Sequence, residues 1–175
     1  MSGGLPPEPQ IFRPLDLLEV LTQHGVQFVV IGGVAANLHG SNQLTQDLDL
    51  AYEVSEDNKA RLVSALNELG AVRVTDPEHA GPVTVEGLEH RVESFTTPIG
   101  DVDVFQLARN IGGFVDIRDR AEVVELRGGT VFVADIDSII WSKAGSGRDK
   151  DPAHIRSLER VKEERANRRI EETEA

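Results

Sequence analysis

The chain has 175 residues, of which 39% are hydrophobic and 27% charged, and its net charge is −12. This length allows one globular domain with a real core, while the absence of cysteine excludes disulfides and thiolate metal sites. The acidic charge argues against a general nucleic-acid binder, and no apolar run reaches the roughly 18 residues that cross a bilayer. With no signal sequence recognisable, we expect a cytoplasmic protein without a membrane segment.

The first half of the chain alternates helical and extended patterns. Residues 1–10 are rich in proline and glycine and predict a flexible leader. Leucines at helical spacing predict a helix over 13–25, and the buried pattern "VQFVVI" predicts a central strand that ends at Gly32-Gly33. Three further elements follow: a short helix before Gly40, a strand "DLDLAYEV", and a helix over 55–70 that Ser55 caps and Gly70 ends.

The second half contains extended runs and then helices. The patterns "AVRVTD", "RVESFTTP" and "DVDVFQL" predict strands, the last two forming a hairpin. A short helix near 115–120 precedes two strands in "EVVELRGGTVFVAD", which are joined at Gly128-Gly129. A helix through "SIIWSKAG", capped by Asp135 or Asp137, and a final helix from Pro152 complete the chain.

This order of elements predicts an α/β (α+β) fold, a mixed sheet flanked by helices with a helical C-terminal end. We divide the chain into a leader (1–10), a core (11–140) and a C-terminal helical basic segment (141–175) packed on the same domain. Residues 141–170 hold nine of the 18 lysines and arginines against five acids. Such a stripe could track an RNA backbone, and the alternative is a solvated helix with i,i+4 pairs such as Arg160 with Glu164.

Two Asp-x-Asp pairs are the main chemical feature of the sequence. On a strand, residues two apart share a face, so Asp47 and Asp49 converge on one side of the sheet, and Asp101 and Asp103 repeat the geometry. Carboxylates gathered in a cleft repel one another, and hard oxygen ligands suit Mg²⁺ or Mn²⁺. A half-exposed strand is the alternative explanation of the same pattern.

The glycine pair gives a second chemical signal. Gly32 and Gly33 follow a buried strand and open a helix, where backbone N–H groups can approach an anionic ligand. The sequence around them matches neither a P-loop nor a dinucleotide-binding fingerprint, and a simple tight turn is the alternative. The informative feature is the combination of an apolar strand, Gly-Gly, thirteen residues, Asp-x-Asp and a later acid on a third strand.

This combination resembles the polymerase-β-type nucleotidyltransferase superfamily. Within it, "GGVAANLHG…LTQDLDL" and "DSIIWSKAGSGRDKDPAHI" resemble the AbiEii/MenT-like nucleotidyltransferase toxins of bacterial toxin–antitoxin systems. The resemblance implies two-metal transfer of an NMP from an NTP, with Asp47, Asp49 and Asp103 as metal ligands and Asp103 helping to activate the attacking hydroxyl. It also implies a pyrimidine NTP, the 3′ end of tRNA as acceptor, blocked aminoacylation and translation, and a cognate antitoxin as partner.

The resemblance assigns further residues and also shows departures. Lys143 is the first candidate for triphosphate contact and Arg148 the second, while Asp151 either orients one of them or caps the final helix. The family often has serine at the position of Gly33, so in this chain the contact to phosphate must come from the backbone rather than from a side chain. The loop "GSNQLTQ" lacks the basic residue that the family usually has there. Thr45 matches a hydroxyl residue that the family often has two positions before the first acid; it either contacts the substrate or caps a turn.

Three other functions fit parts of the pattern. An antibiotic-type nucleotidyltransferase would use the same chemistry on a small molecule, and the basic C-terminal stripe favours RNA over it. A metal-dependent glycosyltransferase would explain Asp-x-Asp and leave the Gly-Gly spacing unexplained. A catalytically silent binding partner is disfavoured by the three intact acids, because a scaffold gains nothing from unneutralised carboxylates.

Overall fold

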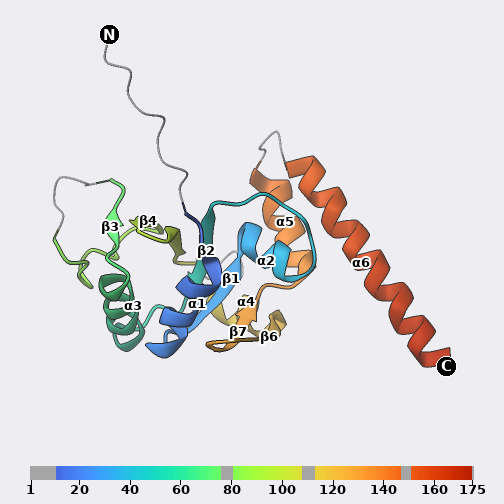
Figure 1. Ribbon diagram of the computed structural model, residues 1–175, viewed down its shortest axis with the longest axis horizontal. Coiled ribbons are helices and arrows are strands. Elements are labelled where there is room, and N and C mark those ends of the chain that lie inside the picture. The colour runs from blue at the N-terminus through green and yellow to red at the C-terminus, as the bar shows by residue number, and fades with distance from the viewer. Residues whose placement is uncertain (1–10, 76–80, 108–112, 147–150, 175) are drawn as a thin grey trace, which may run out of the picture.

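The computed structural model describes residues 11–75, 81–107, 113–146 and 151–174. Their strands form a seven-stranded mixed sheet in the order β3-β4-β5-β2-β1-β7-β6 (Figure 1). The strands are β1 (Phe28–Ile31), β2 (Asp47–Tyr52), β3 (Val72–Arg73), β4 (Val92–Thr97), β5 (Gly100–Phe105), β6 (Glu122–Leu126) and β7 (Gly129–Val133). The pairs β2–β5 and β1–β7 are parallel, and the other neighbouring pairs are antiparallel.

Six helices accompany this sheet in the described part of the chain. They are α1 (Pro14–Gln23), α2 (Gly32–Leu38), α3 (Glu56–Glu68), α4 (Phe114–Arg120), α5 (Ile136–Ser146) and α6 (Asp151–Glu174). Among the residues described, no helix combines the length and the apolar character that a membrane span requires.

The main core lies between one face of the sheet and the helices α1 and α3, which contact each other. Strand residues two apart share a face, so the side chains of Val30, Leu50 and Val104 all point to this side. They meet buried leucines of the two helices, Leu17, Leu18, Leu21, Leu62 and Leu66. These apolar side chains are thereby removed from water, and a shift of one residue in strand pairing would expose them, so their burial fixes the register of the central strands.

A buried asparagine joins α3 to the two central strands. The side chain of Asn58 is 1% exposed; it accepts from the Gln27 amide at 2.7 Å and donates to the carbonyls of Gln27 and Glu53 at 2.9 and 2.8 Å. Ser55 caps the same helix by accepting from the Asn58 amide at 3.3 Å. These bonds satisfy buried backbone groups where β1 begins and β2 ends, and so hold the two strands in place.

The predicted elements are present, with one difference in the length of a strand and one in the exposure of a strand face. The run "AVRVTD" was expected to be a longer strand, and only Val72 and Arg73 pair with β4. The strand "DLDLAYEV" was expected to have one wet face, but Ala51 is fully buried on that face. Helices α2 and α4 lie over this face of the sheet. Within β2, only Asp47 and Asp49, near the N-terminal end of the strand, stay partly exposed.

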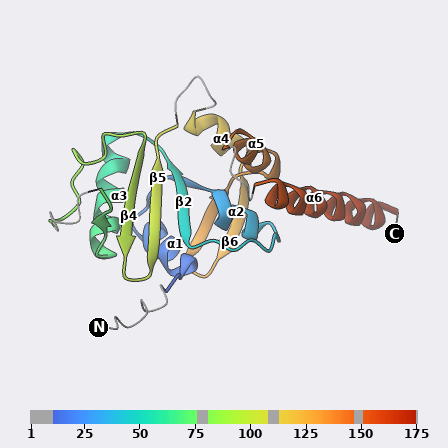
Figure 2. The same ribbon diagram turned by 90° about the horizontal axis from the view of Figure 1, so that it is seen from above.

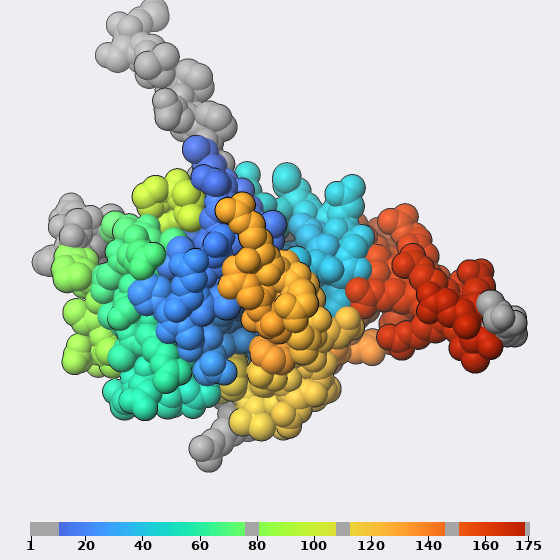
Figure 3. Space-filling model, turned by 60° about the horizontal axis from the view of Figure 1, so that its bottom comes forward, coloured from blue at the N-terminus to red at the C-terminus, as the bar shows by residue number. Residues whose placement is uncertain are grey.

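Helix α6 is long, and only its first part packs against the rest of the molecule. Leu158 and Val161 are buried, and α6 contacts α5, whereas residues 166–173 are exposed. Figures 2 and 3 show this helix, in red, extending away from the rest of the molecule. Helix α5 spans the 140/141 boundary that we drew between core and C-terminal segment, and residues 1–10 lie outside the described part.

Candidate active site

The three predicted carboxylates meet at one point on the sheet. Parallel pairing of β2 with β5 sets Asp49 beside Asp103 and Asp47 beside Asp101, so all four side chains leave the same face. Carboxylate oxygens of Asp47, Asp49 and Asp103 lie within 4.8 Å of one another. Two strands that are far apart in sequence thus build one acidic cluster.

This cluster fits a divalent cation. Like charges at about 4 Å repel by roughly 4 kcal/mol at an effective dielectric of 20, and a cation between them reverses the sign of the interaction. Three carboxylate oxygens from a rigid sheet are hard ligands of the kind that Mg²⁺ and Mn²⁺ take, with coordination positions left for phosphate or water. Asp101 lies next to Asp47, and its Oδ1 is buried with no hydrogen-bond partner in the described part of the chain.

The glycine pair is placed against the acids by the antiparallel pairing of β1 and β2. Ile31 at the end of β1 pairs with Asp49, and Gly32 then opens α2 with a φ of +67°. A Cβ added at Gly32 would lie 2.8 Å from Cγ of Asp49. Gly32 is therefore required twice, for its left-handed backbone and for the room that it leaves to the Asp49 carboxylate.

Thr45 and Gly33 form a second close approach. The Thr45 hydroxyl donates to Oδ1 of Asp47 at 2.9 Å and lies 3.2 Å from the Asp47 carbonyl oxygen. A Cβ added at Gly33 would be 2.7 Å from that hydroxyl and 2.8 Å from Cβ of Thr45. Thr45 thus contacts Asp47 directly, and its side chain occupies the space that a side chain at position 33 would need.

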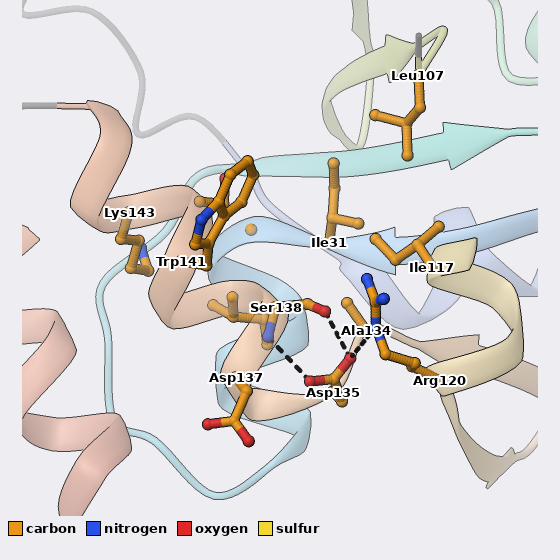
Figure 4. A pocket seen from close by; sticks show the side chains of 13 residues that line it. Ile31, Leu107, Ile117, Arg120, Ala134, Asp135, Asp137, Ser138, Trp141 and Lys143 are labelled. Carbon is orange, nitrogen blue, oxygen red and sulfur yellow. Dashed lines mark hydrogen bonds and ion pairs between the residues drawn. The ribbon is translucent and has the colours of Figure 1, made fainter. Parts of the chain in front are cut away.

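A pocket of about 740 Å³ opens beside the cluster (Figure 4). Gly32 and Ile31 form the wall that it shares with the acidic cluster, and Lys143 on α5 also lines it. The structure therefore brings Lys143, the predicted phosphate contact, to the same cavity as Gly32, the first of the two predicted glycines. The other lining residues come from α4, from α5 and its N-terminal turn, and from the segment after β5: Leu107, Ile117, Arg120, Ala134, Asp135, Asp137, Ser138, Ile139, Trp141 and Ser142.

Asp135 fixes one wall of this pocket. It caps α5 by accepting from the Ser138 amide at 2.9 Å and from the Ser138 hydroxyl at 2.6 Å, and Nε of Arg120 lies 3.6 Å from its Oδ2. Burial alone would raise the pKa of Asp135, but the Ser138 hydrogen bonds and the Arg120 charge outweigh it and lower the pKa. Asp135 is consequently ionised at neutral pH and holds Arg120 at the pocket.

The predicted basic end is only partly available for a ligand. Arg148 lies outside the described residues, and Asp151 is buried at the first position of α6. Three cations of α6 have acidic neighbours: Lys162 with Asp137 at 2.5 Å, Arg165 with Glu122 at 3.1 Å, and Arg160 with Glu164 at 3.8 Å. The expected Arg160–Glu164 pair is confirmed.

Sequence reasoning missed the pocket wall made by Arg120, Ile117 and Trp141. These residues belong to two different helices, α4 and α5, and share no spacing pattern, so only the structure shows that they line one pocket. The one available signal was Trp141 itself, a large aromatic residue directly before the predicted Ser142-Lys143 motif.

Comparison with known proteins gives results at the level of structure. No family model matches the sequence, and no curated protein matches it either. The chain is similar to the lincosamide antibiotic adenylyltransferase LnuA in its lincomycin-bound structure, with a TM-score of 0.62 and 12% identity over 87% of this chain and 99% of that one. It is also similar to ANT(2″)-Ia in complex with adenylyl-2″-tobramycin, with a TM-score of 0.54 and 14% identity over 89% and 94%.

A third similar structure is an antigenic nucleotidyltransferase-like protein from Paracoccidioides brasiliensis, with a TM-score of 0.56 and 16% identity over 85% of this chain and 72% of that one. At these identities the likeness establishes architecture. The mixed sheet, its flanking helices and the added C-terminal helix together have the nucleotidyltransferase fold.

Proposed function

We propose that this protein is a divalent-metal-dependent nucleotidyltransferase that transfers the NMP of an NTP to a hydroxyl group. The observation that carries the proposal is the meeting of Asp47, Asp49 and Asp103 within 4.8 Å beside Gly32, in a chain with the nucleotidyltransferase fold. A structural sheet has no use for three converging carboxylates, because their repulsion destabilises the fold unless a cation is bound.

The reaction is an in-line displacement at the α-phosphorus. The acceptor oxygen forms the new O–P bond, the bond to the β-phosphate oxygen breaks, and pyrophosphate leaves. When bound, Mg²⁺ held by Asp47, Asp49 and Asp103 supplies charge neutralisation for the phosphate oxygens. Asp103 accepts the proton of the attacking hydroxyl, and Thr45 keeps Asp47 in its orientation.

Two further groups serve the triphosphate in this proposal. Lys143, on the pocket wall, contributes a compact positive charge, and Arg148 is a second candidate. The backbone amides of Gly32 and Gly33 approach the phosphates, since glycine has no side chain of its own to keep a ligand away from its backbone. Asp151, which is buried at the start of α6, is the residue that would orient Lys143 or Arg148.

For the acceptor, our first candidate is the 3′ end of tRNA, with growth arrest as the outcome and an antitoxin protein as partner. The support is the resemblance of "GGVAANLHG…LTQDLDL" and "DSIIWSKAGSGRDKDPAHI" to the AbiEii/MenT-like toxins. Arg168 and Arg169, both exposed on the projecting part of α6, add charge of the sign that RNA requires.

The second candidate is a small-molecule acceptor of the antibiotic type. LnuA and ANT(2″)-Ia, whose structures hold lincomycin and an adenylylated tobramycin, align over nearly their whole length with this chain. The pocket of about 740 Å³ beside the acids is within the usual size range for small-molecule sites.

One experiment separates the two acceptors. The purified protein is incubated with Mg²⁺ and each α-³²P-labelled NTP in turn, together with total tRNA, lincomycin or tobramycin, beside an Asp49→Asn variant. Label in tRNA supports the toxin assignment, and label in either antibiotic supports the small-molecule assignment. Label that persists in Asp49→Asn would contradict the metal assignment, and the absence of any transfer would contradict the proposed activity.

A further inference from the structure

The pocket beside the acidic cluster has a wall whose role the proposed reaction leaves open. It begins at Gly32, next to Asp49, and continues between α4 and α5 (Figure 4). Because Gly32 both contacts Asp49 and lines the pocket, a nucleotide whose α-phosphate lies at the cluster has this opening next to it. The chemistry of the wall therefore indicates which part of the nucleotide enters.

Much of the wall is apolar. Ile31, Ile117 and Leu107 lie on one side, and Trp141 of α5 lies across from Ile117 and Leu107. The Trp141 side chain is 69% exposed although it is the largest apolar group in the chain. Flat aromatic faces of this kind stack with nucleobases, and apolar walls exclude water from a bound ring.

The wall carries two positive groups, Arg120 and Lys143, and two negative groups, Asp135 and Asp137. Lys143 is the group assigned above to the triphosphate, and the other three lie deeper along α4 and the start of α5. Asp135 is engaged by Arg120 and Ser138, and Asp137 is paired with Lys162. A triphosphate placed against Asp135 and Asp137 would meet negative charge, whereas a nucleobase is neutral and needs hydrogen-bond partners only. Arg120 supplies such a partner, because its guanidinium group carries donors and no acceptor.

We infer that this pocket binds the base of the donor nucleotide, with the ring stacked on Trp141 and an edge bearing hydrogen-bond acceptors turned to Arg120. The inference rests on the proposed nucleotidyl transfer and specifies where its substrate lies. An arginine fork pairs best with two neighbouring acceptors, such as O6 and N7 of guanine or O2 and N3 of cytosine. Arg120 accordingly selects against adenine.

The chain contains a single tryptophan, so its fluorescence reports on this site alone. The full-length protein with Mg²⁺ is titrated with CTP, GTP, UTP and ATP, and separately with inorganic tripolyphosphate, while binding is measured in parallel by equilibrium dialysis. We expect saturable quenching by the nucleotides, with CTP and GTP binding more tightly than ATP, and no quenching by bound tripolyphosphate.

Three results would overturn this placement. Nucleotide binding by dialysis with unchanged tryptophan emission puts the base elsewhere and leaves nucleotidyl transfer intact. Equal quenching by tripolyphosphate means that the pocket takes phosphates. The absence of any nucleotide binding removes the proposed function together with this inference.

Variants test the two contacts separately. Trp141→Ala should raise the Kd for CTP and GTP about 5- to 150-fold and leave tripolyphosphate binding unchanged, because stacking on an aromatic ring contributes about 1–3 kcal/mol. Trp141→Phe should recover most of the loss, and Ile170→Ala, an exposed apolar residue on the far part of α6, serves as the matched control. An equal loss of tripolyphosphate affinity in Trp141→Ala would contradict stacking.

Arg120→Gln tests the edge contact. Glutamine offers both a donor and an acceptor, so it no longer favours bases with two neighbouring acceptors. In this variant the ratio of the Kd for ATP to the Kd for CTP or GTP should fall by about tenfold. Unchanged ratios of the nucleotide Kd values would remove Arg120 from base recognition.

Discussion

Gly32 combines a left-handed backbone with contact to a functional carboxylate. Its φ of +67° disfavours any L side chain, and an added Cβ would press on Asp49. The position thus sets how close α2 can come to the acidic cluster. Substitution here changes the geometry of the site directly.

We expect Gly32→Ala to lower the rate of nucleotidyl transfer by about 100-fold, because a displacement of about 1 Å at a reacting centre has an effect of this size. Gly145→Ala in α5 is the control: an added Cβ there meets nothing within 4 Å, and alanine favours a helix. Labelled-NTP transfer and thermal unfolding are measured for both variants. Equal activities of the two variants would show that the contact with Asp49 has no role.

Thr45 gives a milder test of the same site. Thr45→Val removes the hydrogen bond to Asp47 Oδ1 and keeps the shape of the side chain, and Thr45→Ser restores the hydroxyl. Since hydrogen bonds to charged groups contribute about 1.5–3 kcal/mol, kcat should fall about tenfold or more in Thr45→Val and recover in Thr45→Ser. A change confined to KM would instead favour the direct substrate contact that the sequence also allowed.

At the scale of elements, α5 presents the pocket and depends on its cap. Asp135→Ala removes the acceptor for the Ser138 amide and should lower the free energy of unfolding by about 1 kcal/mol at pH 7. The lowered pKa of Asp135 sets the pH dependence: its stabilising effect is complete above the usual carboxyl value of 3.8 and is lost as pH falls through the lower folded-state pKa. Chemical denaturation of wild type and variant from pH 7 to pH 2.5 should therefore show a difference that shrinks only below about 3.8. A constant difference down to pH 2.5 would show that charge has no part in the cap.

The elements also show what sequence could and could not predict. The acidic cluster was predictable because alternation on a strand and the Gly-Gly spacing are local, and strand pairing then aligned Asp49 with Asp103. The lengths of β3 and α6 were harder to predict from the sequence. Strand β3 pairs over two residues only, and the second half of α6 has no buried face, so its apolar residues show no helical periodicity. The Trp141–Arg120 wall depends on where α4 and α5 are placed on either side of the pocket, and no sequence pattern encodes that placement.

At the scale of the molecule, the basic charges stand apart from an acidic body. Arg168 and Arg169 lie on the exposed part of α6, which extends beyond the core. If RNA is the acceptor, these two residues contribute phosphate contacts at a distance from the reacting centre. If the acceptor is a small molecule, they have no part in the reaction.

The double substitution Arg168→Glu with Arg169→Glu distinguishes these cases. For an RNA acceptor, the slope of log K against log salt concentration should become shallower by about 2, one for each lost phosphate contact. Transfer to a small molecule should stay at the wild-type rate. An unchanged slope for tRNA would remove the far part of α6 from RNA binding, and matched unfolding curves would show that the fold is intact.

The pairing of β2 with β5 has a consequence for folding as well as for chemistry. Asp49 and Asp103 are 54 positions apart in the chain, and only the finished sheet brings them together. A cation that binds there binds the native state and not the unfolded chain, so the stability of the fold depends on the cation concentration.

A cation concentration of 100 times Kd raises the free energy of unfolding by about 2.7 kcal/mol, which corresponds to a rise in Tm of roughly 5–10 °C for a chain of this size. Mg²⁺ should produce that rise in the wild type and not in Asp49→Asn at matched ionic strength, and an equal rise in both would place the ion elsewhere. The same carboxylates that weaken the empty sheet would then make the native state responsive to magnesium before any substrate arrives.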